Sequence, residues 1–205
     1  MDHSFPVRRT PRLLLREIVD ADAPALFAIH SDIETMRWFG VDPMKEPREA
    51  IALATLFASW FGSKTGVRWA LVRRIDNQLI GTAGLFRWNK SWRNCMIGFE
   101  LARSFHHQGY MIEAVSSILH YGFSDLRLNR VQAEIHPENI ASGTLVEKLG
   151  FKLEGVHREQ GFWGDQFHDL NCHGLLARDW HESDVESERA PNDHRRRGDD
   201  ADDRT

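Results

Sequence analysis

The sequence predicts a single α/β domain built around one mixed sheet. Strand-like and helix-like hydrophobic patterns alternate along the chain, and the connections between them are short and rich in turn-forming residues. Neither an internal repeat nor a linker appears before about residue 180. At 205 residues the chain is long enough for one well-packed domain followed by a tail.

The N-terminal half alternates strands with two helices. Asp20 or Asp22 marks the start of the first helix as a capping residue, and Pro47 marks the second as a first-turn proline. A turn-forming segment between two apolar runs indicates a hairpin. The predicted elements are a strand over 11–18, a helix over 20–31, a loop over 38–47, a helix over 47–61, and strands over 67–74, 79–88 and 94–101.

The C-terminal half begins with a long amphipathic helix after Gly109. Apolar residues recur along one face of this helix, namely Ile112, Val115, Leu119, Gly122 and Phe123. Alternation of apolar and polar residues predicts a half-buried strand over 130–135. A short helix follows the turn at Pro137 and ends at Gly150, which suits a C-terminal cap. Two final strands fit 151–158 and 167–176.

The composition is that of a soluble globular protein, with 41% hydrophobic and 27% charged residues. No apolar run approaches 18 residues, and the first ten residues do not resemble a signal peptide, so we expect a cytoplasmic protein without a membrane partner. Cys95 and Cys172 lie far apart without CxxC spacing. Two reduced thiols are therefore favoured over a single disulfide.

The negative charge is concentrated at the C-terminus. Residues 181–205 hold nine Asp and Glu residues and five Arg, a net charge of −4, so residues 1–180 carry 21 basic and 21 acidic groups and balance to zero. We expect an N-terminal arm over 1–9, a domain over 10–180 and a disordered charged tail over 181–205. Nucleic-acid binding is not expected, because a neutral domain lacks the basic surface that phosphate neutralisation requires.

The stretch "SFHHQGYMIEA" (104–114) places a glycine turn directly before the long helix. The first N–H groups of a helix have no intrahelical partner, and the helix dipole places partial positive charge there. A preceding turn that directs these groups to one point makes an anion site without lysine. Gly109 permits positive φ and close approach to a ligand, and His106, His107 and Gln108 offer side-chain donors around the rim. A glycine that merely ends a loop explains the same pattern.

The segment "MIGFELARSFHHQGYMIEAVSSILHYGFSDLRLNRVQAEIHPENIASGTLVEKLGFKLEGVHREQ" resembles the acetyl-CoA core of the GNAT N-acetyltransferases. Within this family the likeness is to the RimJ/RimL branch, whose best-known members acetylate N-termini of ribosomal proteins. The final "GDQFHDLNCHGLLARDW" extends it to about residue 180. The resemblance implies a single-domain GNAT fold, with a mixed, mostly antiparallel central sheet, helices on both faces and a splayed pair of central strands. It also implies acetyl-CoA as the co-substrate.

Carried over residue by residue, the resemblance assigns the cofactor site. The family's phosphate loop reads Q/R-x-x-G-x-G/A, and the matching residues are His106, His107, Gln108, Gly109, Tyr110 and Met111. Gly109 fits this pattern, whereas His106 and Met111 depart from it. The resemblance implies pyrophosphate on 106–111, pantetheine along the strand from Phe99 to Leu101, and Asn139 and Ser142 beside the thiol end. Helix capping is an alternative role for Asn139.

Acetyl transfer to an amine requires a neutral amine and a proton for the leaving thiolate. Glu100 is the first candidate for the base, at the bulged strand that the family uses to open a slot; a charge on a solvated strand face is the alternative. Many family members protonate the thiolate with a tyrosine, but Val146 stands at that position. Ser142 is the candidate acid or thiol hydrogen-bond donor, with capping as its alternative role.

No motif in the sequence identifies the acceptor. In the family the loop between the first two helices covers the acceptor, so the resemblance implies that Trp38 and Phe39 wall its pocket. Trp88 is a further candidate, because large aromatic rings beside loops tend to line binding surfaces. Plain packing explains these aromatic residues equally well. No Cys or His spacing resembles a zinc site, so we expect no metal.

The leading hypothesis is an acetyl-CoA-dependent N-acetyltransferase that moves acetyl directly to a primary amine, with a protein N-terminal α-amine as the first choice. Direct transfer is favoured because neither cysteine has a recognisable nucleophile setting. Two alternatives remain. One is a small-molecule acetyltransferase acting on a polyamine or an aminoglycoside, and the other is a non-catalytic acyl-CoA-binding regulator. The oligomeric state, monomer or homodimer, stays open.

Overall fold

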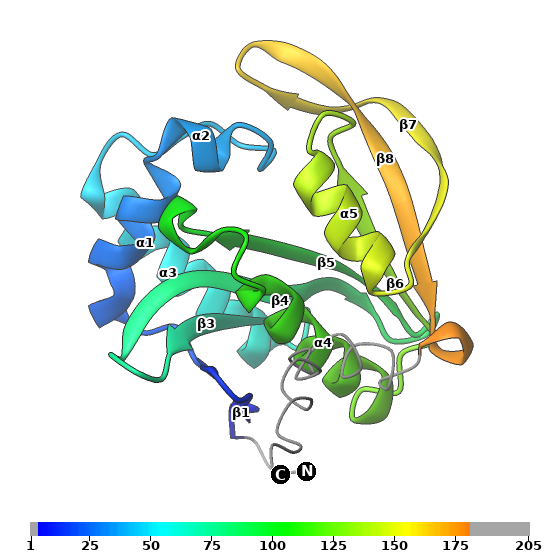
Figure 1. Ribbon diagram of the computed structural model, residues 1–205, viewed down its shortest axis with the longest axis horizontal. Helices are drawn as coiled ribbons and strands as arrows, with labels where there is room; N and C mark the ends of the chain where they lie inside the picture. The colour runs from blue at the N-terminus through cyan, green and yellow to red at the C-terminus, as the bar shows by residue number, and fades with distance from the viewer. Residues whose placement is uncertain (1–3, 181–205) are drawn as a thin grey trace, which may run out of the picture.

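The computed structural model describes residues 4–180, and the expected charged tail, 181–205, lies outside the described residues. One eight-stranded sheet runs through the described part of the molecule (Figure 1). Its order is β1-β2-β3-β4-β5-β6-β8-β7, and only the β5–β6 pair is parallel. The strands are β1 (Arg8–Arg9), β2 (Leu13–Arg16), β3 (Val67–Arg73), β4 (Gln78–Asn89), β5 (Asn94–Leu101), β6 (Arg130–Ile135), β7 (Lys152–Trp163) and β8 (Gln166–Leu176).

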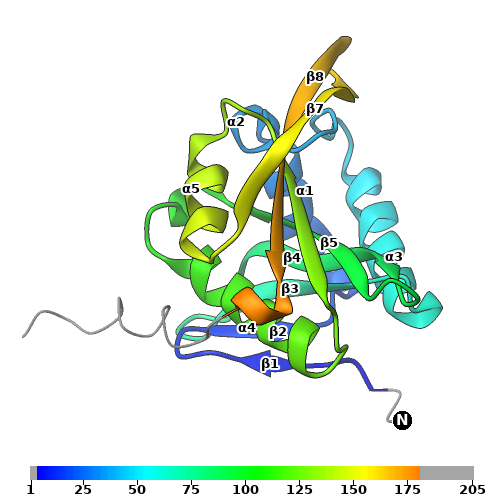
Figure 2. The same ribbon diagram turned by 90° about the vertical axis from the view of Figure 1, so that its right-hand side faces the viewer.

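Helices cover both faces of this sheet (Figure 2). On one face, α1 (Ala23–His30) and α3 (Pro47–Ser63) enclose a smaller apolar core. On the other face, α4 (Tyr110–Ser124) and α5 (Ile140–Lys148) enclose the larger one. The remaining helical segments are α2 (Ile33–Met36) and the 3₁₀ turns η1 (Asp20–Asp22), η2 (Arg103–Phe105) and η3 (Ala177–Asp179). The α/β class and the mostly antiparallel sheet predicted from the sequence are confirmed.

The order of the predicted elements is confirmed, and the differences concern elements with weak local patterns. β1 contains only two residues, and α2 is a single turn capped by Asp32, which accepts the N–H of Thr35 at 2.7 Å. β7 continues to Trp163, beyond the predicted end at 158. Most of its side chains are exposed, so the sequence shows no apolar alternation that would mark its full length.

The N-terminal arm packs against the domain. Phe5 makes an edge contact with Trp69, with ring centroids 5.9 Å apart, and the carbonyl of Pro6 accepts the indole N–H of Trp69 at 2.7 Å. Trp69 is fully buried. At the other end of the domain, Trp180 packs against Phe123 and the larger core.

The two central strands diverge. β5 pairs with β6 only from Asn94 to Met96, although β5 continues to Leu101. The splayed pair implied by the resemblance is therefore present. The expected bulge is not: the β4–β5 ladder runs without a register shift from Met96 to Leu101. The backbone of β5 beyond Met96 is thus released from β6 while β4 still supports it on the other side.

Candidate active site

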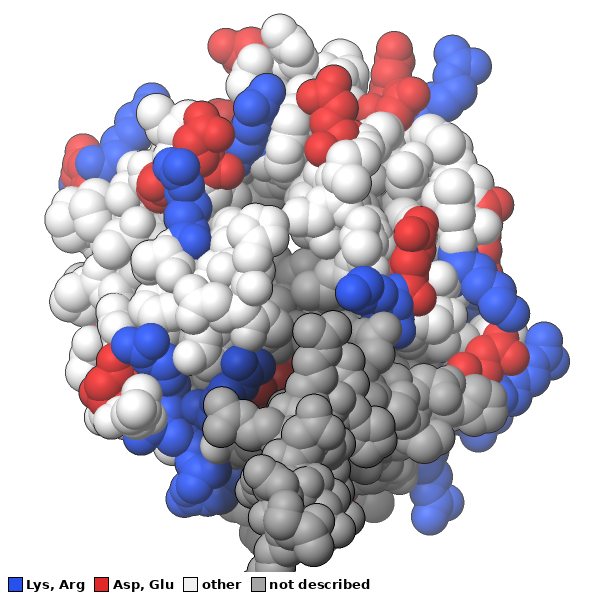
Figure 3. All heavy atoms as spheres, in the orientation of Figure 1, with Lys and Arg blue, Asp and Glu red and all other residues white. Residues whose placement is uncertain are grey.

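A cavity of about 600 Å³ lies where β5 and β6 part. Four segments line it: α2 with the loop after it, the end of β5, the glycine turn with the start of α4, and α5. Figure 3 shows a hollow between two lobes on this face, with acidic and basic side chains around its rim. Among the residues predicted for the site, the lining includes Trp38, Phe39, Phe99, Glu100, Leu101, His106, His107, Gly109, Tyr110, Met111, Asn139 and Ser142.

The glycine turn has the backbone that an anion site needs. Gly109 caps α4 with φ of 74°, in the left-handed region that favours glycine, and no side chain caps the helix. The exposed N-terminus of α4 therefore faces the cavity with its first N–H groups unpaired within the helix. A Cβ at Gly109 would meet the guanidinium of Arg12 at 3.4 Å.

The side chains of the turn differ from the expected rim of donors. His106 Nε2 donates to the carbonyl of Leu101 at 2.8 Å, and Gln108 Nε2 donates to the carbonyl of Ser104 at 2.8 Å. Both side chains therefore brace the turn from within. Tyr110 and Met111 are buried in the larger core, although both also line the cavity. His107 also lines the cavity, so its ring and the backbone N–H groups at the start of α4 are the donors that can face a ligand here.

Glu100 is a buried carboxylate held by three neighbours, not a charge on a solvated strand face. Its two oxygens accept from Arg68 of β3 and from Thr82 of β4. His30, at the end of α1, places Nε2 3.3 Å from Glu100 Oε1, an ion-pair distance without hydrogen-bond alignment. Arg68 and Thr82 lie on neighbouring strands of the sheet, and His30 lies on a helix that packs against the sheet, so the three partners of Glu100 are distant in sequence but close in space.

The charge state of this cluster follows from its contacts. Burial alone would raise the pKa of Glu100, but Arg68, His30 and Thr82 outweigh burial and lower it. Burial lowers the pKa of Arg68 against the opposite effect of Glu100, yet a guanidinium remains protonated in proteins. Glu100 is therefore an ionised carboxylate and a weak base.

Two glycines make room for this ion pair. A Cβ at Gly84 would lie 2.9 Å from Arg68 Cδ, and one at Gly98 would lie 3.2 Å from Arg68 Nη1. The same guanidinium donates to the carbonyl of Gly98 at 2.9 Å and lies 4.9 Å from the ring centroid of Phe57. Arg68 can lie flat across the sheet only because both positions lack side chains.

Asn139 and Ser142 meet at the start of α5. Asn139 Oδ1 accepts the backbone N–H of Ser142 at 3.2 Å, so Asn139 caps the helix, as its alternative role predicted. Ser142 contributes its backbone N–H to this cap and also lines the cavity. Val146, one turn further on, is fully buried.

An aromatic cluster, which we call the clamp, joins the loop after α2 to the β7–β8 hairpin. Trp38 stacks on His136 at 4.1 Å, Trp163 stacks on His168 at 3.8 Å, and the two imidazoles lie 5.3 Å apart. The indole N–H of Trp163 donates to the carbonyl of Arg37 at 3.3 Å. Burial, His168 and Arg37 lower the pKa of His136 against the opposite effects of Glu138 and Asp169.

The predicted acceptor residues separate into two groups. Trp38 and Phe39 line the cavity, and Phe39 packs on His30 with ring centroids 5.3 Å apart. Trp88 does not belong to the lining; it packs near the far end of β4, with Lys90 over its ring at 5.0 Å. Trp88 therefore lies apart from this cavity. A strand pattern predicts which residues face a core, not which end of the strand meets a cavity.

Sequence reasoning missed Arg68, Thr82 and His30. One signal was present: Arg68 interrupts the apolar run "VRWALV", in which every residue proves to be buried. A charge in a fully buried strand requires a partner of opposite charge. Its identity depends on strand register, which the sequence alone does not reveal.

Within residues 4–180, no three His, Cys, Asp or Glu side chains form a group that could hold a metal ion. In that same part of the chain, no helix has the length and apolar character needed to cross a bilayer. Cys95 and Cys172 are both buried free thiols, as predicted, and burial raises the pKa of Cys95 to about 12.

The chain matches known acetyltransferases over most of its length. Residues 12–152 match the acetyltransferase (GNAT) domain. The uncharacterized N-acetyltransferase YoaA of Bacillus subtilis is 36% identical over 172 residues, covering 84% of this chain and 97% of that protein. The ribosomal protein uS5-alanine N-acetyltransferase of Escherichia coli is 26% identical over 106 residues, covering 51% of this chain and 55% of that protein.

A solved structure supports the fold independently. Spermidine N-acetyltransferase from Vibrio cholerae, in complex with CoA and spermine, has a TM-score of 0.73 at 20% identity, over 83% of this chain and 98% of that chain. The resemblance stated from the sequence, including the likeness to ribosomal-protein N-acetyltransferases, is confirmed. Because the family domain spans residues 12–152 and a close relative aligns over nearly its whole length, the chain belongs to the GNAT acetyltransferase family and is an acyltransferase.

Proposed function

We propose that this enzyme transfers acetyl from acetyl-CoA directly to the α-amine of a protein N-terminus. The observation that supports this acceptor is the setting of Glu100: its two oxygens already accept from Arg68 and Thr82, and this ion pair lowers its pKa and makes it a weak base. A weak base cannot readily deprotonate a lysine-like ammonium, whose pKa is about 10.4, whereas an α-amine with a pKa of about 7.7–8.0 is already partly neutral at physiological pH. The E. coli relative named for alanine acetylation on ribosomal protein uS5 makes the same acceptor class a reasonable choice.

The chemistry of the cavity lining suits the co-substrate. The open N-terminus of α4 at Gly109 suits a pyrophosphate, and the released edge of β5 from Phe99 to Leu101 suits the amides of pantetheine. Asn139 and Ser142 lie on the opposite wall, at the start of α5, where the thiol end would lie. Acetyl-CoA supplies an activated thioester, and the protein positions it.

Proton transfer is divided between two residues of this chain. Glu100 receives the amine proton through one water, which its weak basicity allows when the amine is already partly neutral. The hydroxyl of Ser142 donates a hydrogen bond to the leaving thiolate, or gives it a proton that solvent then replaces, while Glu100 returns the amine proton to solvent. The reaction needs no acyl-enzyme, because Cys95 and Cys172 are buried and neither lines the cavity.

A small cationic amine is the second candidate acceptor. Glu34 and Glu138 line the cavity and would attract a polyamine, and the V. cholerae neighbour acts on spermidine by its name. The non-catalytic regulator is not retained, because the chain belongs to a family of acyltransferases.

An acceptor panel read by free-thiol release tests the proposal. It contains a short peptide with a free α-amine and no lysine, the same peptide with a blocked N-terminus and one lysine, spermidine, and an aminoglycoside. We expect the free α-amine peptide to give the highest kcat/KM, rising with pH through the amine pKa, because only the neutral amine reacts. A kcat/KM for spermidine about tenfold above that of the peptide would contradict the α-amine proposal and favour a small cationic amine as the acceptor.

A further inference from the structure

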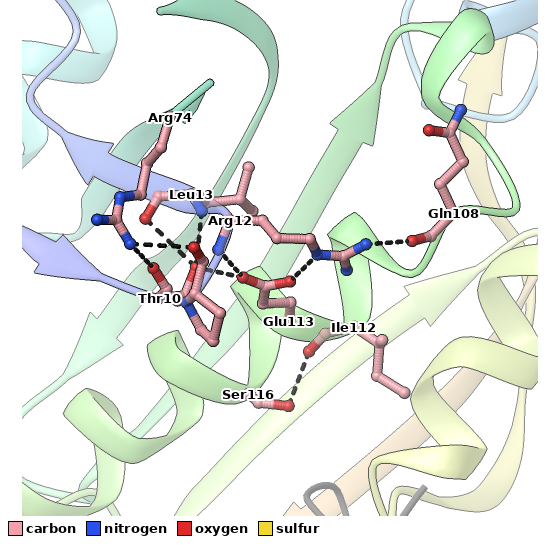
Figure 4. A network of polar contacts seen from close by, with 9 residues as sticks. Thr10, Arg12, Leu13, Arg74, Gln108, Ile112, Glu113 and Ser116 are labelled. Carbon is pink, nitrogen blue, oxygen red and sulfur yellow. Dashed lines mark hydrogen bonds and ion pairs between the residues drawn. The ribbon is translucent and has the colours of Figure 1, made fainter. Parts of the chain in front are cut away.

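A buried carboxylate lies directly behind the glycine turn. Glu113 sits in the first turn of α4, is 3% exposed and does not line the cavity. Its Oε1 accepts the backbone N–H of Arg12 at 2.8 Å and the hydroxyl of Thr10 at 2.5 Å, and its Oε2 accepts Arg12 Nε at 2.6 Å (Figure 4). Burial alone would raise the pKa of Glu113, but these hydrogen bonds outweigh burial and lower it. Glu113 is therefore an anion inside the fold.

Arg12 extends from this carboxylate to the turn itself. Its Nη1 donates to the carbonyl of Gln108 at 2.8 Å (Figure 4). Its Cζ also lies 4.4 Å from the ring centroid of Tyr110. In a trans peptide the C=O and the following N–H point in opposite directions. Holding the Gln108 carbonyl against Arg12 therefore turns the N–H of Gly109 away from Arg12. One guanidinium thus sets the orientation of the peptide that precedes α4.

The same guanidinium removes an electrostatic obstacle. An unpaired carboxylate in the first turn of α4 would repel a ligand phosphate at that helix end, and low local dielectric would strengthen the repulsion. Arg12 neutralises Glu113 while its fixed fork also reaches Gln108. A lysine at this position would keep the charge but could not span both groups with the same geometry.

We propose that Arg12 is a positioning residue for the co-substrate: it fixes the Gln108–Gly109 peptide and neutralises Glu113 so that the turn can bind the pyrophosphate of CoA. This inference rests on the proposed function, in which residues 106–111 bind that group. Arg12 acts through the turn and does not line the cavity itself.

The test compares two arginine-to-lysine variants in β2 and its preceding turn. Arg12→Lys removes the fork that joins Glu113 to Gln108. Arg16→Lys is the matched control, because Arg16 holds another buried carboxylate, Asp22, through Nη1 and Nη2 at 2.7 Å each, away from the cavity. Titration calorimetry gives the Kd of CoA and of pantetheine, which lacks the pyrophosphate, for both variants and the wild type. Thermal unfolding of each confirms that it is folded.

We expect Arg12→Lys to raise the Kd of CoA by about tenfold, the effect of losing a charge-assisted hydrogen bond. The Kd of pantetheine should stay unchanged, and Arg16→Lys should bind both ligands as the wild type does. An unchanged Kd of CoA in Arg12→Lys would overturn this inference but not the proposed function. The inference would also fail if Arg12→Lys weakened pantetheine binding as much as CoA binding, or if Arg16→Lys weakened CoA binding as much as Arg12→Lys does, because either result would indicate general destabilisation. A wild-type protein that binds no CoA would refute the proposed function together with this inference.

Discussion

Glu100→Gln should destabilise the protein strongly, because it leaves the guanidinium of Arg68 buried without a counter-charge. The side chain of Arg68 is 3% exposed and does not line the cavity, so water cannot replace the lost carboxylate beside its guanidinium. Removing one partner of a buried ion pair costs about 3–5 kcal/mol. Glutamine keeps one acceptor oxygen for Arg68, so we expect the free energy of unfolding to fall by about 3 kcal/mol, at the lower end of that range.

Urea unfolding measures this loss against a matched exposed pair. Asp76→Asn removes the carboxylate partner of Arg73, whose ion pair lies at the surface. It should cost far less than Glu100→Gln, because solvent screens exposed pairs. Combining Glu100→Gln with Arg68→Met removes both buried charges and should recover most of the stability. If Glu100→Gln costs no more than Asp76→Asn, the buried pair does not hold this part of the sheet.

The stability difference has a defined pH dependence. The pKa of Glu100 is lower in the folded protein than in the unfolded chain, where it is about 4.3. The wild type therefore gains stability from this carboxylate above about pH 4.3 and loses the gain as the pH falls through the folded value. The gap between wild type and Glu100→Gln should narrow over that acid range. A gap that is constant with pH would contradict an ionised Glu100.

The same double variant separates stability from catalysis. If Glu100 accepts the amine proton, the Glu100→Gln/Arg68→Met protein should regain stability while kcat at pH 7 remains about 100-fold below the wild type, the typical loss of a general base. A kcat that recovers with stability would show that Glu100 serves only the fold.

Two further substitutions test the cofactor site and the proposed acid. Gly109→Val should raise the Kd of CoA at least about tenfold, because valine is strained at positive φ and adds bulk at the turn; Gly164→Val carries similar strain in the β7–β8 turn, where φ is 58°, and should leave that Kd unchanged. Ser142→Ala should lower kcat by about tenfold or more without changing CoA binding, because alanine keeps the backbone N–H that caps α5 with Asn139. Equal CoA affinity in both glycine variants, or an undiminished kcat in Ser142→Ala, would contradict these roles.

Features of the structure that depend on a few neighbouring residues could be predicted from the sequence. The turn at Gly109 and the cap at Asn139 could be predicted because each depends on a few neighbouring residues. The roles of the His106 and Gln108 side chains could not, since a polar side chain beside a turn can face either a ligand or a backbone carbonyl. Chemistry alone does not decide between the two directions.

Contacts between distant segments were beyond prediction. His30, Arg68 and Glu100 meet because three elements adopt one register and packing, and no local pattern encodes that meeting. The family likeness assigned Glu100 to the site without revealing its partners. Those partners decide its basicity and therefore bear on the choice of acceptor.

The clamp has a consequence for the order in which the enzyme assembles. Its hydrogen bond from Trp163 to Arg37 spans 126 positions along the chain. Closing so long a loop directly from the unfolded chain would cost about 4 kcal/mol of free energy from lost chain entropy, in addition to the constant part that every loop pays whatever its length. The sheet must therefore form first and bring the hairpin to the loop after α2. A chain still emerging from the ribosome cannot complete the clamp before His168 has been synthesised, so the wall of the cavity that contains Trp38 matures only after most of the domain has been made.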